Sequence, residues 1–554
     1  MSTSRAIWPS RLQLNKVSPK ALADKVWDVA IIGSGMGGAT AGYALAQKGH
    51  RVIVLEKGNA SFPGGDHDEH LDEEDPQERF KYGVWPTQIT SVVEGRRSRF
   101  FGPVGCGAGG STLLYAAALE RLEPNDFGLH DAASHTENAW PFPYETLLPY
   151  YRTAEQLFKV RGTQDALNTD RESELLPPPP MSECDNHFFS SFKERGLNPY
   201  RLHVGIGYGD KCRECLGFIC NQNCKSDAKN ICLEPAIQTG NLTLLDQCEV
   251  KRLDADEKAA REVVCIRDGK EIRIRARIFI VAAGAYFTPV LLQNSVNKFW
   301  PNGLANHADN VGRNLMFHIS DFIAVWPKGK FSREGPAKTI SLRDFYFQDG
   351  KSLGSFQSTG LTVEYGNVIY ALKNRFDRSR WSWFKPIRPF LRIPAYLASF
   401  FLGPATVFAT IMEDRPYPEN RVVTDAEEPS GMRFEYTVHD ELRERIKLFR
   451  KTLKSKLAPH RLFVLGEEVS LNYGHPCGTC RMGSDPESSV LDVNCKAHEV
   501  DNLYVVDASF MPTSGGANPS LTIAANALRV AEHISERLAD TAADEQPGEV
   551  KASA

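Results

Sequence analysis

The sequence predicts an α/β fold built from two closely packed domains, and two observations carry this prediction. The chain has 554 residues, which exceeds the size at which a single hydrophobic core keeps growing. Residues 28–58 follow a strand, turn, helix and strand pattern, with apolar Val29–Ile32, a glycine cluster, Ala39–Lys48 and Val52–Leu55. Two strands that are joined through a helix run parallel to each other in the sheet, which is typical of doubly wound folds.

The turn inside this first unit carries a specific glycine pattern. Gly33, Gly35 and Gly38 satisfy G-x-G-x-x-G between a strand and a helix, and Glu56 closes the second strand. Such a turn lets the backbone approach a pyrophosphate at a helix N-terminus, and the acidic residue accepts hydrogen bonds from ribose hydroxyls. The pattern therefore predicts a dinucleotide site, without separating NAD from FAD. A glycine-rich turn with no ligand is the alternative.

Further elements are expected along the chain. Residues 271–281 and 502–506 are predicted strands, and Leu521–Leu538 is a predicted helix that follows Pro519. The net charge of -4, with 24% charged and 42% hydrophobic residues, supplies no broad basic surface, so nucleic acid is not expected as a partner.

Four motifs in the same order together resemble the glucose-methanol-choline (GMC) family of flavin oxidoreductases. They are the glycine fingerprint, Gly105–Thr112, Val281–Pro289, and the C-terminal pieces His475–Gly483 and Asp507–Pro519. The resemblance implies a Rossmann-like FAD domain assembled from separated segments, with an α+β substrate domain around a large antiparallel sheet. The implied boundaries are 24–130 and 236–320 for the FAD domain, 131–235 for a linker with a cysteine-rich loop and substrate-domain elements, 321–465 for the substrate domain, 466–540 for the C-terminal FAD and catalytic segment, and 541–554 for a disordered tail.

The resemblance also implies which residues hold FAD. Beyond the fingerprint and Glu56, the expected contacts are Gly109, Gly110, Ser111, Ala283, Gly284, Asp507, Ala508, Asn518 and Pro519. Some family members attach the flavin covalently through a histidine near the Gly109–Ser111 turn. Here residues 112–115 are Thr, Leu, Leu and Tyr, so we expect FAD to be bound non-covalently.

Oxidation of an alcohol carbon needs a base with a pKa near neutrality beside an electron sink, and histidine suits the first role. His475 matches the family's catalytic histidine, and Asn518 falls on its second position, where an uncharged amide can hold the substrate oxygen. We therefore expect transfer of a hydride from a sugar, polyol, sterol or similar alcohol to flavin N5, with a single titrating base. Oxygen, a quinone or a protein carrier could each accept the electrons.

Two rival functions stay open at this point. One is a lyase without net redox chemistry that keeps FAD, and the other is an assembly subunit that keeps the fold without turnover. Intact His475 and Asn518 argue against the second.

Cysteines are crowded after residue 211. Cys212, Cys215, Cys220 and Cys224 lie within thirteen residues, with Cys232 further on. Some bacterial sugar dehydrogenases of the same family hold an iron-sulfur cluster on a similar Cys-x3-Cys, which makes these four thiols candidate cluster ligands. A zinc site or a loop of free thiols is the alternative.

One segment raises the question of a membrane. Residues 1–27 lack a secretory h-region and no apolar run reaches the ~20 residues that span a bilayer, so a cytoplasmic protein is expected. Trp381–Ile411, however, mixes aromatic residues with Lys385, Arg388 and Arg392. This composition allows peripheral contact with the inner membrane, or else a buried or substrate-capping segment.

Overall fold

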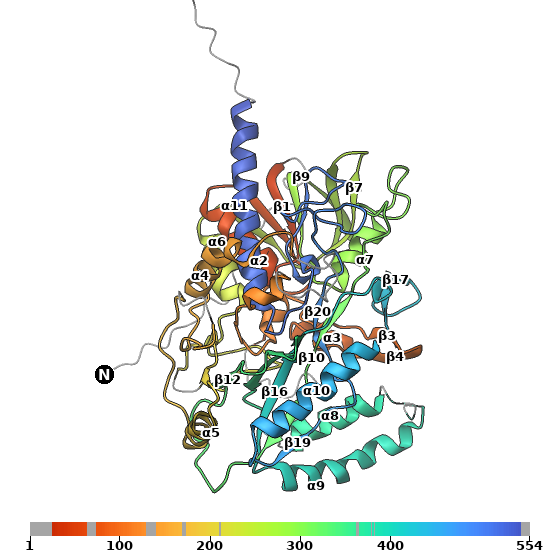
Figure 1. Ribbon diagram of the computed structural model, residues 1–554. Helices are drawn as coiled ribbons and strands as arrows, with labels where there is room; N and C mark the ends of the chain where they lie inside the picture. The colour runs from red at the N-terminus through yellow and green to blue at the C-terminus, as the bar shows by residue number, and fades with distance from the viewer. Residues whose placement is uncertain are drawn as a thin grey trace, which may run out of the picture.

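The computed structural model describes residues 25–63, 74–128, 140–168, 173–209, 212–361, 365–377, 379, 381 and 383–544. Within these ranges the fold has two large sheets, of seven and eight strands (Figure 1). Residues of both sheets line one large cavity.

The first sheet is predominantly parallel, as a doubly wound domain requires. Its seven described strands are β1 (Val26–Ile32), β2 (Val52–Leu55), β6 (Leu242–Leu245), β7 (Cys248–Ala255), β8 (Ala260–Arg267), β9 (Lys270–Val281) and β21 (Leu503–Val505). The order is β6-β2-β1-β9-β8-β7, with β21 beside β9. The sheet therefore draws on three stretches far apart in the chain, which confirms the predicted assembly from separated segments.

The predicted unit at residues 28–58 is confirmed. Strands β1 and β2 pair in parallel with Val29 opposite Val52, and every residue of β2 is buried. The connecting helix α2 (Met36–Gln47) begins three residues before the predicted Ala39. The reason is that Gly37 and Gly38 belong to its first turn, where they press against backbone carbonyls of neighbouring segments.

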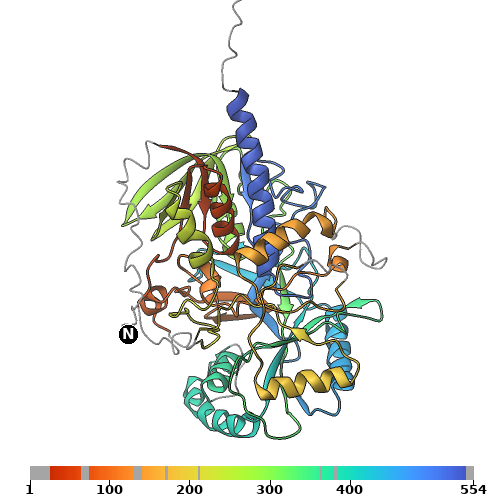
Figure 2. The same ribbon diagram turned by 90° about the vertical axis from the view of Figure 1, so that its left-hand side faces the viewer.

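Helices pack beside this sheet, and α2 contacts β1 and β2. Helix α11 (Ser520–Asp544) packs along α2, as Figures 1 and 2 both show, and α4 (Leu148–Leu157) packs on α11. The helical turns η6 (Lys229–Leu233) and α6 (Glu234–Gln238) contact α2 from its other side. Because α11 extends to Asp544, residues 541–544 are helical rather than part of the predicted tail, and residues 545–554 of that tail lie outside the described residues.

The second sheet is antiparallel and forms the predicted substrate domain. Its eight described strands are β5 (Tyr200–Arg201), β10 (Met316–Ile319), β11 (Phe322–Val325), β12 (Ile340–Leu342), β15 (Gly354–Ser358), β16 (Thr406–Met412), β19 (Leu462–Val464) and β20 (Leu471–Cys477). Strand β10 pairs with both β16 and β20, so it connects the sheet to the segment that carries His475.

The two faces of β16 serve different purposes. Val407, Ala409 and Ile411 line the large cavity, whereas Phe408 and Met412 pack into a core. This alternation follows from the two-residue period of a strand. The core side is covered by α5 (Glu183–Glu194) and α10 (Asp440–Lys456), which contribute apolar side chains to the same cluster.

Smaller elements complete the described fold. A four-stranded sheet contains β3 (Ile89–Val93), β4 (Arg96–Phe100), β17 (Arg421–Thr424) and β18 (Met432–Tyr436), and β13 (Phe347–Gln348) pairs with β14 (Lys351–Ser352). The remaining helices and helical turns are α3 (Pro76–Lys81), η2 (Gly110–Leu113), η3 (Pro124–Phe127), η5 (Tyr144–Thr146), α7 (Phe287–Asn294), α8 (Tyr365–Asp377), η7 (Lys385–Leu391), α9 (Arg392–Leu402) and η8 (Ala508–Phe510).

Candidate active site

The fingerprint turn is tightly enclosed on one side and open on the other. A Cβ on Gly33, whose φ is +96°, would lie 2.3 Å from the carbonyl oxygen of Ala282, and one on Gly38 would lie 2.1 Å from that of Gly33. Only glycine fits these two positions. A Cβ on Gly35 would meet nothing closer than 3.9 Å, and Gly35 lines the cavity. The open side of the turn therefore faces the space where a ligand would lie.

Helix α2 begins at this turn without a side-chain cap. Its N-cap residue is Gly35, and no side chain accepts a hydrogen bond from the first turn. The first N–H groups of a helix have no partner within the helix, and they attract anions such as a pyrophosphate.

A second glycine loop meets the first, backbone against backbone. Gly110 has a φ of +55°, and a Cβ there would lie 2.7 Å from the Cα of Gly35. Gly109, at a φ of +108°, begins this turn, and Ser111 accepts a hydrogen bond from the backbone of Gly105. Gly110 and Ser111 line the cavity, whereas Gly109 and Gly38 support it from behind.

Glu56 is held in place by the fingerprint turn itself. Its carboxylate accepts hydrogen bonds from the Ser34 hydroxyl at 2.5 Å, from the Ser34 backbone at 3.1 Å and from the Gly58 backbone at 2.8 Å. Burial raises the pKa of Glu56, although these hydrogen bonds lower it. The fixed carboxylate lines the cavity and suits the predicted ribose contact. Ser34 was not predicted from the sequence, because the motif leaves that position unspecified.

Asp507 connects two of the predicted segments. One carboxylate oxygen accepts from the Gly284 backbone and the Thr288 hydroxyl, and the other accepts from the backbone and hydroxyl of Ser509. These four contacts use the acceptor positions of a carboxylate. Asp507 therefore positions the turn around Gly284 at the cavity wall, and burial raises its pKa.

The cavity that these elements enclose has a volume of about 1190 Å³. Typical ligand sites have about 300–1,000 Å³, so this one has room for a dinucleotide together with a substrate. Its wall contains most of the predicted cofactor residues and both predicted catalytic residues: Gly33, Gly35, Glu56, Gly110, Ser111, Ala283, Gly284, His475, Asp507, Ala508, Asn518 and Pro519.

His475 has a histidine partner that the sequence analysis did not identify. Its Nδ1 lies 3.2 Å from Nδ1 of His318, and Nε2 of His318 lies 3.1 Å from the carbonyl oxygen of Ser514. His318 comes from β10 and is fully buried. The amide nitrogen of Asn472 lies 3.3 Å from the same Nδ1 of His475.

The contact with His318 indicates which nitrogen of His475 is free, whereas the amide nitrogen of Asn472, a donor beside the same Nδ1, favours the opposite tautomer. A carbonyl can only accept, so Nε2 of His318 carries the hydrogen and Nδ1 of the same neutral ring is an acceptor. Nδ1 of His475 must then donate to it. Nε2 of His475 is left unprotonated, which is the state that a general base requires.

Both histidines are neutral at physiological pH. Burial lowers the pKa of His475 to about 4, and burial together with the nearby His475 lowers the pKa of His318 to about 3. The direction of this shift is away from the near-neutral pKa expected of the base, with burial as its cause, although the ring of His475 is only partly buried and lies on the cavity wall. The ring is ready to accept a proton, but it is a weaker base than expected.

Asn518 presents an unused polar atom. Its side chain is 7% exposed, it lines the cavity, and its Oδ1 makes no hydrogen bond to the described residues. A buried polar atom of this kind usually has a partner, and in a ligand site the partner is the ligand. Helix α11 starts two residues later, at Ser520.

The predicted metal ligands do not come together. Cys212 interacts with Cys224, and Cys215 shares a hydrogen bond with Cys220. Across the described ranges, no three His, Cys, Asp or Glu residues are placed to hold a metal ion. Two thiol pairs do not fit the ligand set of an iron-sulfur cluster, so the structure gives no support to that prediction.

Lys225 gives the cysteine loop a structural explanation. Its buried ammonium lies 2.8–3.3 Å from the carbonyl oxygens of Leu113, Tyr115, Cys215 and Phe218. Burial lowers the pKa of Lys225 to about 8. The lysine therefore connects the cysteine loop, through hydrogen bonds, to the segment that follows the second glycine turn.

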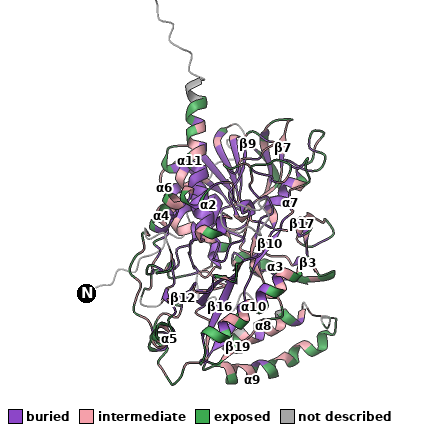
Figure 3. Ribbon diagram, in the orientation of Figure 1, coloured by how far each residue is buried: buried purple, intermediate pink, exposed green. Residues whose placement is uncertain are grey.

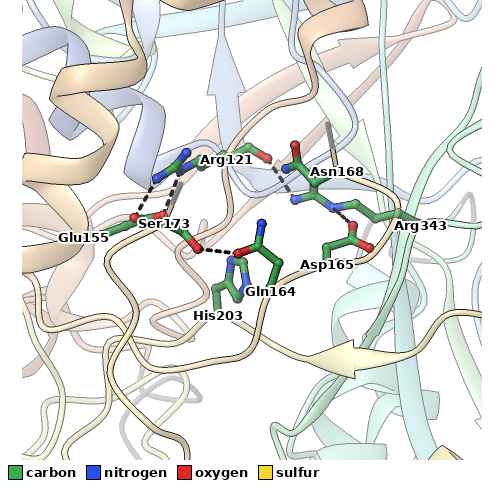
Figure 4. A pocket seen from close by; sticks show the side chains of 8 residues that line it. All are labelled: Arg121, Glu155, Gln164, Asp165, Asn168, Ser173, His203 and Arg343. Atoms are coloured by element: carbon green, nitrogen blue, oxygen red, sulfur yellow. Dashed lines mark hydrogen bonds and ion pairs between the residues drawn. The ribbon is translucent and has the colours of Figure 1, made fainter. Parts of the chain in front are cut away.

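A second, much smaller cavity lies among buried charges (Figure 4). Arg121 pairs with Glu155, and Arg343 pairs with Glu120 and Glu123. The volume of about 10 Å³ holds about one water molecule. These residues stabilise the fold and offer no room for a substrate.

Comparisons with known proteins identify the family of this chain. Family models described as GMC oxidoreductase match residues 30–320 and 416–527. The chain is 28% identical to the 6'''-hydroxyparomomycin C oxidase of Streptomyces lividus, with 93% of each chain covered. It is 27% identical to the 2-methyl-1,2-propanediol dehydrogenase of Mycolicibacterium austroafricanum, covering 93% of this chain and 96% of the relative. The crystal structure of pyridoxine 4-oxidase from Mesorbium loti shares the fold, with a TM-score of 0.60 and 19% identity over 92% of this chain and 99% of that one.

Proposed function

This chain belongs to the GMC oxidoreductase family, a family of FAD-dependent enzymes that act on CH-OH groups, and we propose that it oxidises an alcohol with His475 as the general base. The observation that carries the proposal is the hydrogen bond between the two histidines. It leaves Nε2 of His475 free, on a residue that shares a cavity with the dinucleotide turn.

The residues of the cavity fit FAD. The uncapped start of α2 suits the pyrophosphate, Glu56 suits the ribose, and the turn at Gly110 and Ser111 presents backbone at the cavity wall against which a flat ring can lie. When bound, FAD supplies the acceptor for the hydride that leaves the alcohol carbon.

The two catalytic residues would each form a hydrogen bond with the substrate hydroxyl. We assign to Nε2 of His475 the hydroxyl proton, and to the side-chain amide of Asn518 a hydrogen bond donated to the oxygen of the same hydroxyl, since a hydroxyl has only one proton to donate. The neutral ring is the form that can take this proton, and the lowered pKa of His475 favours that form.

The substrate class follows from the relatives and from the cavity wall. The two relatives named above act, by their names, on a paromomycin derivative and a propanediol. We propose a hydroxylated small molecule for this chain as well. The part of the wall away from the glycine turns combines apolar side chains, such as Phe322, Val407 and Phe463, with polar ones, such as Gln357 and Ser358.

Anaerobic reduction of the bound flavin by a panel of alcohols tests the proposal. His475→Ala should keep FAD but slow single-turnover reduction by about 10²- to 10⁴-fold, the usual contribution of a general base. His307→Ala is the matched control, because that ring stacks on Trp300 outside the cavity wall. Reduction of His475→Ala at the wild-type rate would exclude His475 as the base.

A further inference from the structure

The helical hairpin formed by α8, η7 and α9 has many exposed residues (Figure 3), and many of these are large and apolar. Figures 1 and 2 both place it at the end of the molecule opposite the free end of α11. Its large exposed side chains are Trp381, Trp383, Phe384, Ile387, Phe390, Ile393, Tyr396, Leu397, Phe400 and Phe401. Soluble monomers rarely expose so many neighbouring apolar residues without a partner.

Helix α9 is apolar on two opposite faces. Ile393, Tyr396, Leu397, Phe400 and Phe401 recur at the spacing of one helical face, and each is 50–72% exposed. The opposite face has small or partly covered residues that pack inward: Ala395 is fully buried, and Ala398 and Leu402 line the large cavity. The inner face alone explains how the helix attaches to the protein. The outer face needs a partner of its own.

The charges around this surface indicate the kind of partner. Residues 378–412 include five Lys or Arg residues and no Asp or Glu. Arg388 is paired with Asp377 and Glu74, but no described carboxylate pairs with the exposed Lys385 or Arg392. Aromatic side chains among basic residues suit the interface of an anionic bilayer, where the rings enter the lipid and the cations meet phosphate headgroups. No helix among the described residues is long and apolar enough to cross a bilayer, so the contact would be peripheral.

The same hairpin borders the active-site cavity. Val368 and Leu372 from α8 and Leu402 from α9 line the cavity, together with the exposed Arg375 and Glu467. The cavity therefore reaches the surface beside the hairpin, where apolar residues of α8 and α9 form part of its wall.

We propose that the α8–α9 hairpin docks on an anionic lipid bilayer and that the cavity opening beside it takes an apolar alcohol from that bilayer. The docking stands on the exposed surface alone, whereas the substrate class rests on the alcohol oxidation proposed above. A second copy of this chain is the competing occupant of the hairpin surface, and the experiment must separate the two.

Sedimentation with vesicles tests the docking. The FAD-loaded protein should sediment with vesicles of equimolar phosphatidylcholine and phosphatidylglycerol, and less with phosphatidylcholine alone. The double variant Phe400→Glu with Phe401→Glu should lower the partition coefficient about ten-fold or more, since burial of a single phenylalanine side chain is worth that factor. Phe347→Glu is the matched control, because Phe347 is an exposed aromatic residue on β13, away from the hairpin and the cavity.

Three results would overturn the docking: no sedimentation with either vesicle, equal binding by the double variant and the wild type, or a wild-type dimer that the double variant converts to a monomer in light scattering. The flavin absorbance of the double variant verifies that it is folded. Because vesicle binding needs no substrate, its failure leaves the proposed oxidation intact.

A separate measurement tests the substrate class. Dodecanol in anionic vesicles should bleach the wild-type flavin anaerobically, and the double variant should be slower by about the factor lost in vesicle binding. Butanol in water should bleach both proteins alike. No bleaching by dodecanol, or equal rates in both proteins, would refute the bilayer as the source of the alcohol. If His475→Ala is bleached as fast as the wild type while vesicle binding is unchanged, the proposed function is refuted and the docking is not.

Discussion

Replacement of His318 by leucine tests whether this residue selects the active tautomer of His475. In the wild type, Nδ1 of His318 can only accept, so it holds the hydrogen of His475 on Nδ1. Asn472 favours the other tautomer of His475, because its amide nitrogen is a donor and lies 3.3 Å from Nδ1 of His475. Leucine removes the acceptor and leaves the donor. The ring should then prefer the tautomer in which Nε2 carries the hydrogen and cannot take a proton.

The size of the effect follows from the cost of a buried hydrogen-bonding group without a partner. His318 is fully buried, and such a group costs about 1–3 kcal/mol. If this energy separates the active from the inactive tautomer, the rate falls by about 5- to 150-fold. Stopped-flow reduction of the flavin by an alcohol, without oxygen, measures the rate directly. We expect kcat to fall by this factor with KM little changed, because His318 does not line the cavity.

His318→Asn is the control for this interpretation. Its side-chain oxygen can take the place of Nδ1 as an acceptor, so the rate should stay within about five-fold of the wild type. FAD content and unfolding midpoints of both variants separate a positioning role from a structural one. Equal rates per bound flavin in His318→Leu and the wild type would refute the tautomer argument, as would equally slow rates in both variants.

Three further predictions follow from the structure. The pKa of about 4 for His475 predicts that kcat/KM rises with pH through an apparent pKa near 4 and is flat from about pH 5.5 to 7.5, because the neutral ring is the active form; a limb near 6.5 would contradict the burial of the ring. Gly33→Ala should lose FAD and more than about 2 kcal/mol of unfolding free energy, because its Cβ would contact the carbonyl oxygen of Ala282. Gly49→Ala is the control: Gly49 has a φ of +87° but no atom within 4 Å of its Cβ, so this variant should lose about 1–2 kcal/mol and keep FAD. Similar losses for the two variants in urea unfolding would refute the contact with Ala282. Arg343→Met should cost about 3–5 kcal/mol, because it leaves Glu120 and Glu123 buried without their cation, and denaturant unfolding that shows a loss below about 1 kcal/mol would mean that the ion pairs stabilise little.

The parts of the fold that sequence alone could predict are those with local signals. The alternation of apolar runs with a glycine turn located β1, α2 and β2, and the spacing of Glu56 identified the acidic residue at the end of β2. The family resemblance added Asn518 and His475, which lie about four hundred residues further along the chain and nevertheless line the same cavity.

The residues that were missed act through tertiary contacts. Nothing in the sequence around His318 distinguishes it from any other buried histidine, and its role follows only from the pairing of β10 with β20. Gly37 is a similar case: a Cβ there would lie 2.0 Å from the carbonyl oxygen of Val506, which the fingerprint does not foresee. The cysteine loop is a different case. Close spacing in sequence suggested one cluster, whereas the described thiols interact as Cys212 with Cys224 and Cys215 with Cys220, and no group of three potential ligands is placed to hold a metal ion among the described residues.

The same turn of the chain supports both the dinucleotide site and the catalytic base. Gly33 presses on Ala282, and Asp507 holds the backbone of Gly284 three residues before Phe287, where α7 begins. The hydroxyl of Thr479, in the loop after His475, donates to the carbonyl oxygen of Ala285 in that same turn. A disturbance of the 282–285 turn must therefore reach the dinucleotide site and the imidazole together. Loss of FAD affinity and loss of catalytic rate should accordingly appear in the same variants of this turn, even where the altered residue touches neither the ligand nor His475.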